Sequence, residues 1–196
     1  MSRPLSRDEA WSLFCEWTES ESLRRHVLAV EAAMRAYAER FGEDPEEGGA
    51  VGILHDLDYE KHPDMDADDG HPRTAMRVLT EMDVPDYWVR AIASHADFLH
   101  VSRDTPMEKT LYAVDELSGF IAACAYVRPQ GIHGLTPKSV KKKLKQPSFA
   151  AAVNRDDVRG GADVLGVDFD EHVAFVIAAL EGRADELGLE GSEAAA

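Results

Sequence analysis

The sequence predicts an all-α fold. Apolar residues recur at alternating steps of three and four along much of the chain, which is the spacing of amphipathic helices. Capping residues followed by proline or acids recur as well, and they are typical of helix starts. No stretch shows the sustained alternation of apolar and polar residues that indicates a half-buried strand. Apolar residues make up 44% of the 196 residues, enough for one hydrophobic core.

The clearest helices are expected in the first third of the chain. One apolar stripe runs at steps of four and three through Leu23, Val27, Val30, Met34, Tyr37 and Phe41. Gly42 ends this helix, and Asp44-Pro45 starts the next with a capping carboxylate and a proline in the first turn. Residues 48–54 are small and apolar on all sides, so we expect a buried helix whose glycines allow close packing.

Further helix starts follow along the chain. His71-Pro72 and Pro85-Asp86 open helices that should end near Met82 and His95. A capping box at residues 105–108 begins a long helix that should reach about residue 127. The last three starts are expected at Thr136-Pro137, Asn154 to Asp157 and Asp168 to Glu171.

We expect one domain over residues 1–182, with a helical extension beginning at about residue 129. Residues 183–196 are rich in Glu, Ala and Gly and show little apolar periodicity, so they are expected to form a flexible acidic tail.

Composition narrows the classes of partner. The net charge of −16 argues against binding to nucleic-acid polymers or anionic membranes. The longest apolar run, residues 120–127, is too short to span a bilayer, and no apolar signal core follows Met1, so we expect a cytoplasmic location. Cys15 and Cys124 form no CxxC pair and are expected to stay reduced. The charge does not exclude a small anionic substrate, because a bound metal inverts the local field.

Polar residues on apolar helix faces are the candidates for chemistry. His55-Asp56 follows an apolar run directly, Asp115 stands between apolar neighbours, and His26 lies at the edge of its helix's apolar stripe. A buried carboxylate needs a partner, because leaving it alone costs several kcal/mol. Taken singly, each residue is more commonly a hydrogen-bonded core group. Together they offer nitrogen and oxygen ligands suited to Mn, Fe, Zn, Ni or Mg.

The order His, His-Asp and distant Asp resembles the HD superfamily of metal-dependent phosphohydrolases. The resemblance is carried by Arg25-His26, Ile53 to Glu60, Gly70 to Pro72, Ile92 to Ala96 and Ala113 to Gly119. A branch of small stand-alone bacterial HD proteins is similar over most of the chain, including residues 125–129 and 139–144. The resemblance implies an HD-domain helical bundle with a C-terminal helical extension. It also implies four metal ligands: His26, His55, Asp56 and Asp115.

The resemblance leaves open whether the site holds one ion or two. In two-metal HD proteins, additional histidines between the His-Asp pair and the last Asp bind the second ion. His71 and His95 are suitably placed for this role. The alternative is a helix cap for His71 and a core or solvent-facing position for His95.

Other residues are candidates for catalysis and substrate binding. Asp56 and Asp58 are the candidate catalytic carboxylates, and Asp58 and Glu60 are candidate general bases or ligand-orienting residues, with a polar loop as the alternative. In the lysine-rich segment, Lys141 and Lys142 are candidate contacts for substrate phosphates, although such runs are usually solvated helix faces. Four histidines match no motif, and the last of them is expected at the surface: His62, His100, His133 and His172.

The function implied by the resemblance is metal-dependent hydrolysis of a phosphate ester. The enzyme would be a phosphomonoesterase or phosphodiesterase acting on a nucleotide or a small phosphorylated metabolite, with a metal-activated water as nucleophile. One alternative is a di-iron oxygenase, which the six-ligand set would permit. Another is a non-catalytic metal- or nucleotide-binding module. The sequence shows no base-reading or sugar-reading motif and leaves the oligomeric state open, and fold alone does not select a substrate.

Overall fold

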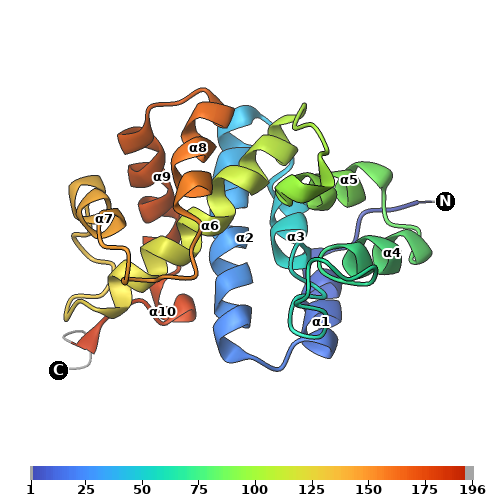
Figure 1. The fold of residues 1–196 in the computed structure, drawn as a ribbon, viewed down its shortest axis with the longest axis horizontal. Helices are drawn as coiled ribbons and strands as arrows, with labels where there is room; N and C mark the ends of the chain where they lie inside the picture. Colours follow the sequence, from blue (N-terminus) through green and yellow to red (C-terminus); the bar gives the residue numbers. More distant parts are fainter. Residues whose placement is uncertain (1, 193–196) are drawn as a thin grey trace. The chain divides into compact units, whose positions relative to one another are not determined.

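The computed structural model describes residues 2–192, and Figure 1 shows that they form helices joined by loops. The described residues contain ten α-helices, one 3-10 turn and no strand, which confirms the all-α prediction. The elements are α1 (Arg7–Trp17), α2 (Glu21–Phe41), α3 (Pro45–Leu54), α4 (Arg73–Glu81), α5 (Asp86–His95), η1 (Asp97–Leu99), α6 (Pro106–Tyr126), α7 (Pro137–Leu144), α8 (Arg155–Leu165), α9 (Phe169–Glu181) and α10 (Ala184–Leu187). None of the helices in this described part is both long and apolar enough to cross a membrane.

The chain divides into two compact units, residues 1–112 and residues 113–196. The boundary falls inside α6, so this helix contributes its first turns to one unit and its remainder to the other. The sequence analysis placed the start of a helical extension later, at about residue 129. The division comes earlier because the second half of α6 packs with the helices that follow it.

In the first unit, α2 and α3 lie side by side (Figure 1), as the small residues of α3 allow. Every residue from Gly48 to Leu54 is buried, which confirms the expected buried helix. A Cβ atom added at Gly48 would lie 3.2 Å from the Cβ atom of Ala38, and one added at Gly52 would lie 3.1 Å from the Cα atom of Glu31. The glycines therefore set the close approach of α3 to α2.

The expected helix starts are confirmed, and all but those of α4 and α5 have a side-chain cap. The Asp44 carboxylate accepts a hydrogen bond from the backbone N–H of Glu46 at the start of α3. At the start of α6, Glu108 accepts hydrogen bonds from the backbone N–H groups of Asp104 and Thr105, and its other oxygen lies 2.8 Å from Arg90 Nε on α5. This buried carboxylate thus fixes α5 against the first turn of α6. The remaining expected caps also accept helix N–H groups: Thr136, Asn154 and Asp168.

In the second unit, α8 and α9 pack against one another, and α9 also packs against α7. The buried side of α9 consists of His172, Val173, Val176, Ile177 and Leu180. The expected surface position of His172 is therefore wrong, because its side chain is fully buried. The neighbouring acids suggested a solvated first turn, but His172 falls on the apolar stripe of α9.

A flexible tail was expected at residues 183–196, and its described part, residues 183–192, contains a short helix and buried leucines. Residues 184–187 form α10, and the side chains of Leu187 and Leu189 are buried. The backbone N–H of Ile132 donates a 2.8 Å hydrogen bond to the Leu189 carbonyl. Residues 193–196, the end of the expected tail, lie outside the described residues.

His133 joins this C-terminal segment to α9. Its Nδ1 lies 3.0 Å from a Glu181 oxygen, and its Nε2 lies 2.8 Å from a Glu190 oxygen. These two carboxylates raise the pKa of His133 above its ordinary value of about 6.5. A raised pKa in the folded state stabilises the fold below pH 6.5, and this contribution disappears as the pH rises through the folded-state pKa.

We therefore expect His133→Gln to remove part of the pH dependence of stability. The thermal midpoint of the wild-type protein should fall relative to that of H133Q by about 1–3 °C between pH 6 and pH 9, because an exposed pair contributes little. Thermal unfolding of both proteins across this range measures the difference. Parallel curves for the two proteins would contradict the assigned role of His133.

Candidate metal centre

The central carboxylate of the candidate site follows α3 directly. His55 is the C-terminal capping residue of α3, and Asp56 begins the turn after it. Because α3 is buried, His55 is fully buried and Asp56 is only 8% exposed. The packing of α3 therefore carries a carboxylate into the interior, where it needs a cation or hydrogen-bond donors.

Three histidines surround Asp56 with their Nε2 atoms. His26 on α2 lies 3.6 Å from one Asp56 oxygen, while His55 and His71 each lie 3.5 Å from the other. His95, the last residue of α5, is the fourth histidine, and its Nε2 lies 3.2 Å from Nε2 of His71. The first unit thus brings together five of the six candidate ligands.

The outer ring nitrogens show which way the imidazole lone pairs point. Nδ1 of His55 lies 2.7 Å from the carbonyl oxygen of Gly52, and Nδ1 of His95 faces the carbonyl oxygen of Ile92. A carbonyl oxygen can only accept, so Nδ1 carries the proton in both rings. In the neutral ring, Nε2 then presents its lone pair to the interior.

His71 has the same orientation, although its outer partner is a carboxylate. Its Nδ1 lies 2.7 Å from an oxygen of Asp58. The pattern in which one ring nitrogen faces a carboxylate or carbonyl and the other faces inward is typical of metal-binding histidines. The Nε2 atoms of His71 and His95 lie 3.2 Å apart, so their lone pairs face each other beside the Asp56 carboxylate and repel each other. A cation bound between them would remove this repulsion.

The donor set fits a divalent metal ion. One ligand atom from each of Asp56, His71 and His95 lies within 4.8 Å of the others. Two ligands bound at about 2.1 Å lie about 3.0 Å apart in octahedral geometry and about 3.4 Å apart in tetrahedral geometry. The observed separations of 3.2 Å and 3.5 Å are close to these values. Imidazole nitrogen with carboxylate oxygen suits Mn, Fe, Zn or Ni.

Asp58 contacts the ring of His71, a candidate ligand. It is fully buried, and its two oxygens accept from Nδ1 of His71 and from the backbone N–H of Ala75 at 2.7 Å. Both oxygens are engaged by the protein, and the catalytic role of Asp58 stays a prediction. The carboxylate fixes His71 relative to α4.

Glu60 has a comparable structural role. Its carboxylate accepts hydrogen bonds from the backbone N–H groups of Glu19 and Ser20, which lower its pKa. Ser20 caps α2, the helix that carries His26. Glu60 therefore links the loop after Asp56 to the start of α2, and its role as a general base stays a prediction.

The other three candidate residues lie in the second unit. Asp115 is half-buried on α6. Lys141 on α7 is paired with Asp170 on α9, with 2.6 Å between Nζ and the carboxylate oxygen, and Lys142 is exposed. The ligand role of Asp115 and the substrate roles of both lysines remain predictions.

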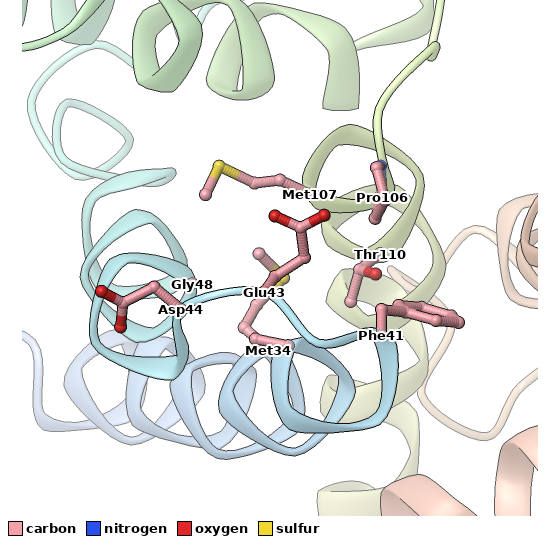
Figure 2. Close-up of a pocket in the computed structure, with 9 residues that line it drawn as sticks. Met34, Phe41, Glu43, Asp44, Gly48, Pro106, Met107 and Thr110 are labelled. Atoms are coloured by element: carbon pink, nitrogen blue, oxygen red, sulfur yellow. The ribbon is translucent and has the colours of Figure 1, made fainter.

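A separate shallow pocket lies in the first unit, between the end of α2, the start of α3 and the first turn of α6. Figure 2 shows Met34, Phe41, Glu43, Met107 and Thr110 among the residues that line it. None of the residues that line it is a candidate metal ligand. The histidine cluster, rather than this pocket, holds the groups suited to chemistry.

Sequence reasoning missed the two backbone carbonyls that orient His55 and His95. Each belongs to the residue three positions earlier, Gly52 or Ile92, and each histidine stands at a helix C-terminus. The last carbonyls of a helix lack intrahelical donors and are available to such a ring. A histidine that ends an apolar helix is therefore the signal that could have revealed this arrangement.

Comparison with known proteins identifies the family. The HD domain model matches residues 23–119, a range that contains all six candidate ligands. No curated protein and no solved structure matches the chain. The family match and the histidine–aspartate cluster lead to the same assignment: the chain belongs to the HD superfamily of metal-dependent phosphohydrolases, with its HD domain at residues 23–119.

Proposed function

We propose that this protein is a metal-dependent hydrolase that cleaves a phosphate ester of a nucleotide or other small metabolite. The observation that supports the proposal best is the group of imidazole Nε2 atoms turned toward Asp56 within an HD domain. The orientation of these rings favours metal binding, and the family supplies the class of reaction.

We assign Asp56 to the centre of a site for one or two ions. His71 and His95 join Asp56 in one set of ligands, whose atoms lie within 4.8 Å of each other. His55 lies at the same Asp56 oxygen as His71, and His26 lies at the other oxygen. Asp115 completes the ligand set through its place in the family's sequence pattern.

A bound divalent ion would lower the pKa of a water molecule, supply it as the nucleophile and offset the charge of the phosphate. The protein's own contribution is to fix the ligands. The Gly52 and Ile92 carbonyls and Asp58 hold three of the imidazole rings in the tautomer that binds metal. The ion would also offset the repulsion between an anionic substrate and a chain with a net charge of −16.

A panel of phosphate esters tests the proposed reaction. Protein reloaded with Mn, Fe, Zn, Ni or Mg should release phosphate or a phosphomonoester from at least one nucleotide or sugar phosphate, and chelation should abolish the release. Metal analysis of the purified protein accompanies the assay. Iron-dependent oxygen consumption without hydrolysis of any ester would contradict the proposal and favour the oxygenase alternative.

Asp56→Ala should abolish metal binding and hydrolysis together. The variant loses the carboxylate that three Nε2 atoms share, so activity should fall by roughly 100-fold or more while the helical content is unchanged. Metal titration, circular dichroism and the ester assay measure these effects. Asp66→Ala, which removes an exposed carboxylate of the same unit, is the matched control. Full activity of D56A after chelation and reloading would refute the assigned role.

The number of ions depends on His95 and on the orientation of His71. His95→Ala should reduce the stoichiometry from two ions toward one, and Asp58→Asn should weaken the same ion about 10- to 100-fold by releasing the His71 ring. His62→Ala, a histidine outside the cluster, should change neither value. Metal stoichiometry and anomalous scattering distinguish the variants. If the wild-type protein binds only one ion at saturating metal, the assignment of a second ion to His95 is wrong.

A further inference from the structure

His172 is a buried histidine that takes no part in the proposed reaction. It lies on α9, and its Nε2 is 3.0 Å from the carbonyl oxygen of Ala113 on α6. A carbonyl oxygen accepts hydrogen bonds only, so this Nε2 is the donor. Ala113 precedes Asp115 by two residues on the same helix. The hydrogen bond therefore reaches the turn of α6 that carries the proposed metal ligand.

A second helix of the same unit contacts the same residue. Gly161 on α8 approaches Ala113 so closely that an added Cβ atom would lie 2.7 Å from the Ala113 Cα atom and 3.0 Å from its carbonyl oxygen. Helix α8 thus contacts Ala113 through its backbone, and α9 contacts it through the hydrogen bond of His172.

The residue after Asp115 is anchored as well. The Glu116 carboxylate accepts a 3.2 Å hydrogen bond from the backbone N–H of Asn154, the residue that caps α8. Fixed contacts therefore lie on both sides of Asp115 in the sequence, at positions 113 and 116.

A directional hydrogen bond at Ala113 fixes the rotation of α6 about its axis better than apolar packing alone. A carboxylate stands about 5 Å from the axis of its helix, so a rotation of about 10° moves it by about 0.9 Å. A metal–ligand distance tolerates a deviation of only about 0.2 Å from its ideal value. A buried histidine costs free energy unless it is hydrogen-bonded, and the bond to the Ala113 carbonyl both satisfies the ring and fixes the rotation of α6.

We propose that His172 is a positioning residue for Asp115, and that α8 and α9 fix the turn of α6 on which this ligand stands. The inference rests on the proposed function, in which Asp115 binds the metal. It assigns a role in metal binding to the second unit, most of which lies beyond the matched HD domain.

Metal affinity of the full-length protein, measured by competition with a chelator, tests this role. His172→Phe keeps the volume but removes the donor, so the affinity should fall roughly tenfold. His172→Gln should recover most of it, because the Gln amide nitrogen occupies the position of Nε2. His172→Asn places its amide at the position of Nδ1 and cannot reach Ala113, so it replaces H172F if that variant does not fold. His133→Gln, in the same unit, should leave the affinity unchanged.

Measurements on Asp115→Ala, alone and combined with His172→Phe, distinguish a failure of this inference from a failure of the proposed function. If Asp115→Ala leaves metal affinity unchanged, the ligand assignment itself is wrong. If D115A weakens binding and H172F does not, the positioning role alone is wrong. The inference predicts that H172F has no further effect in the D115A background. An equal loss in both backgrounds would show a general effect on folding and would overturn it.

Discussion

The buried carboxylate of Asp56 faces the Nε2 atoms of His26, His55 and His71, and the rest of the site is arranged around this contact. The outer nitrogens of His55 and His95 face carbonyl oxygens, which leaves their inner nitrogens unprotonated in the neutral rings. A carboxylate and several lone pairs in one small volume repel each other. A cation bound among them converts this repulsion into attraction, which is why the geometry favours a metal ion.

Much of the first unit serves to bring these groups together. The glycines of α3 allow it to lie against α2, so His55 and Asp56 emerge beside His26. Asp58 holds His71, and Glu108 holds α5, which ends at His95. Each contact acts on a candidate ligand or on the helix that carries one.

The fold class could be predicted from the sequence because it depends on local patterns, the helix caps and the spacing of apolar residues. His55-Asp56 and Asp115 stood out by their apolar neighbours, whereas His71 and His95 became candidate ligands through the resemblance to the HD superfamily. The hydrogen-bond partners of Asp58 and His172 could not be predicted, because each lies far away in the sequence: Ala75 for Asp58 and Ala113 for His172.

The most direct test is the position of the metal in a crystal of the loaded protein, located by anomalous scattering. The account predicts an ion about 2.0–2.3 Å from an Asp56 oxygen and from Nε2 of His71 and His95, with Nδ1 of both histidines still facing Asp58 and the Ile92 carbonyl. Rings turned so that Nε2 faces away from Asp56, or an ion bound elsewhere in the protein, would contradict it.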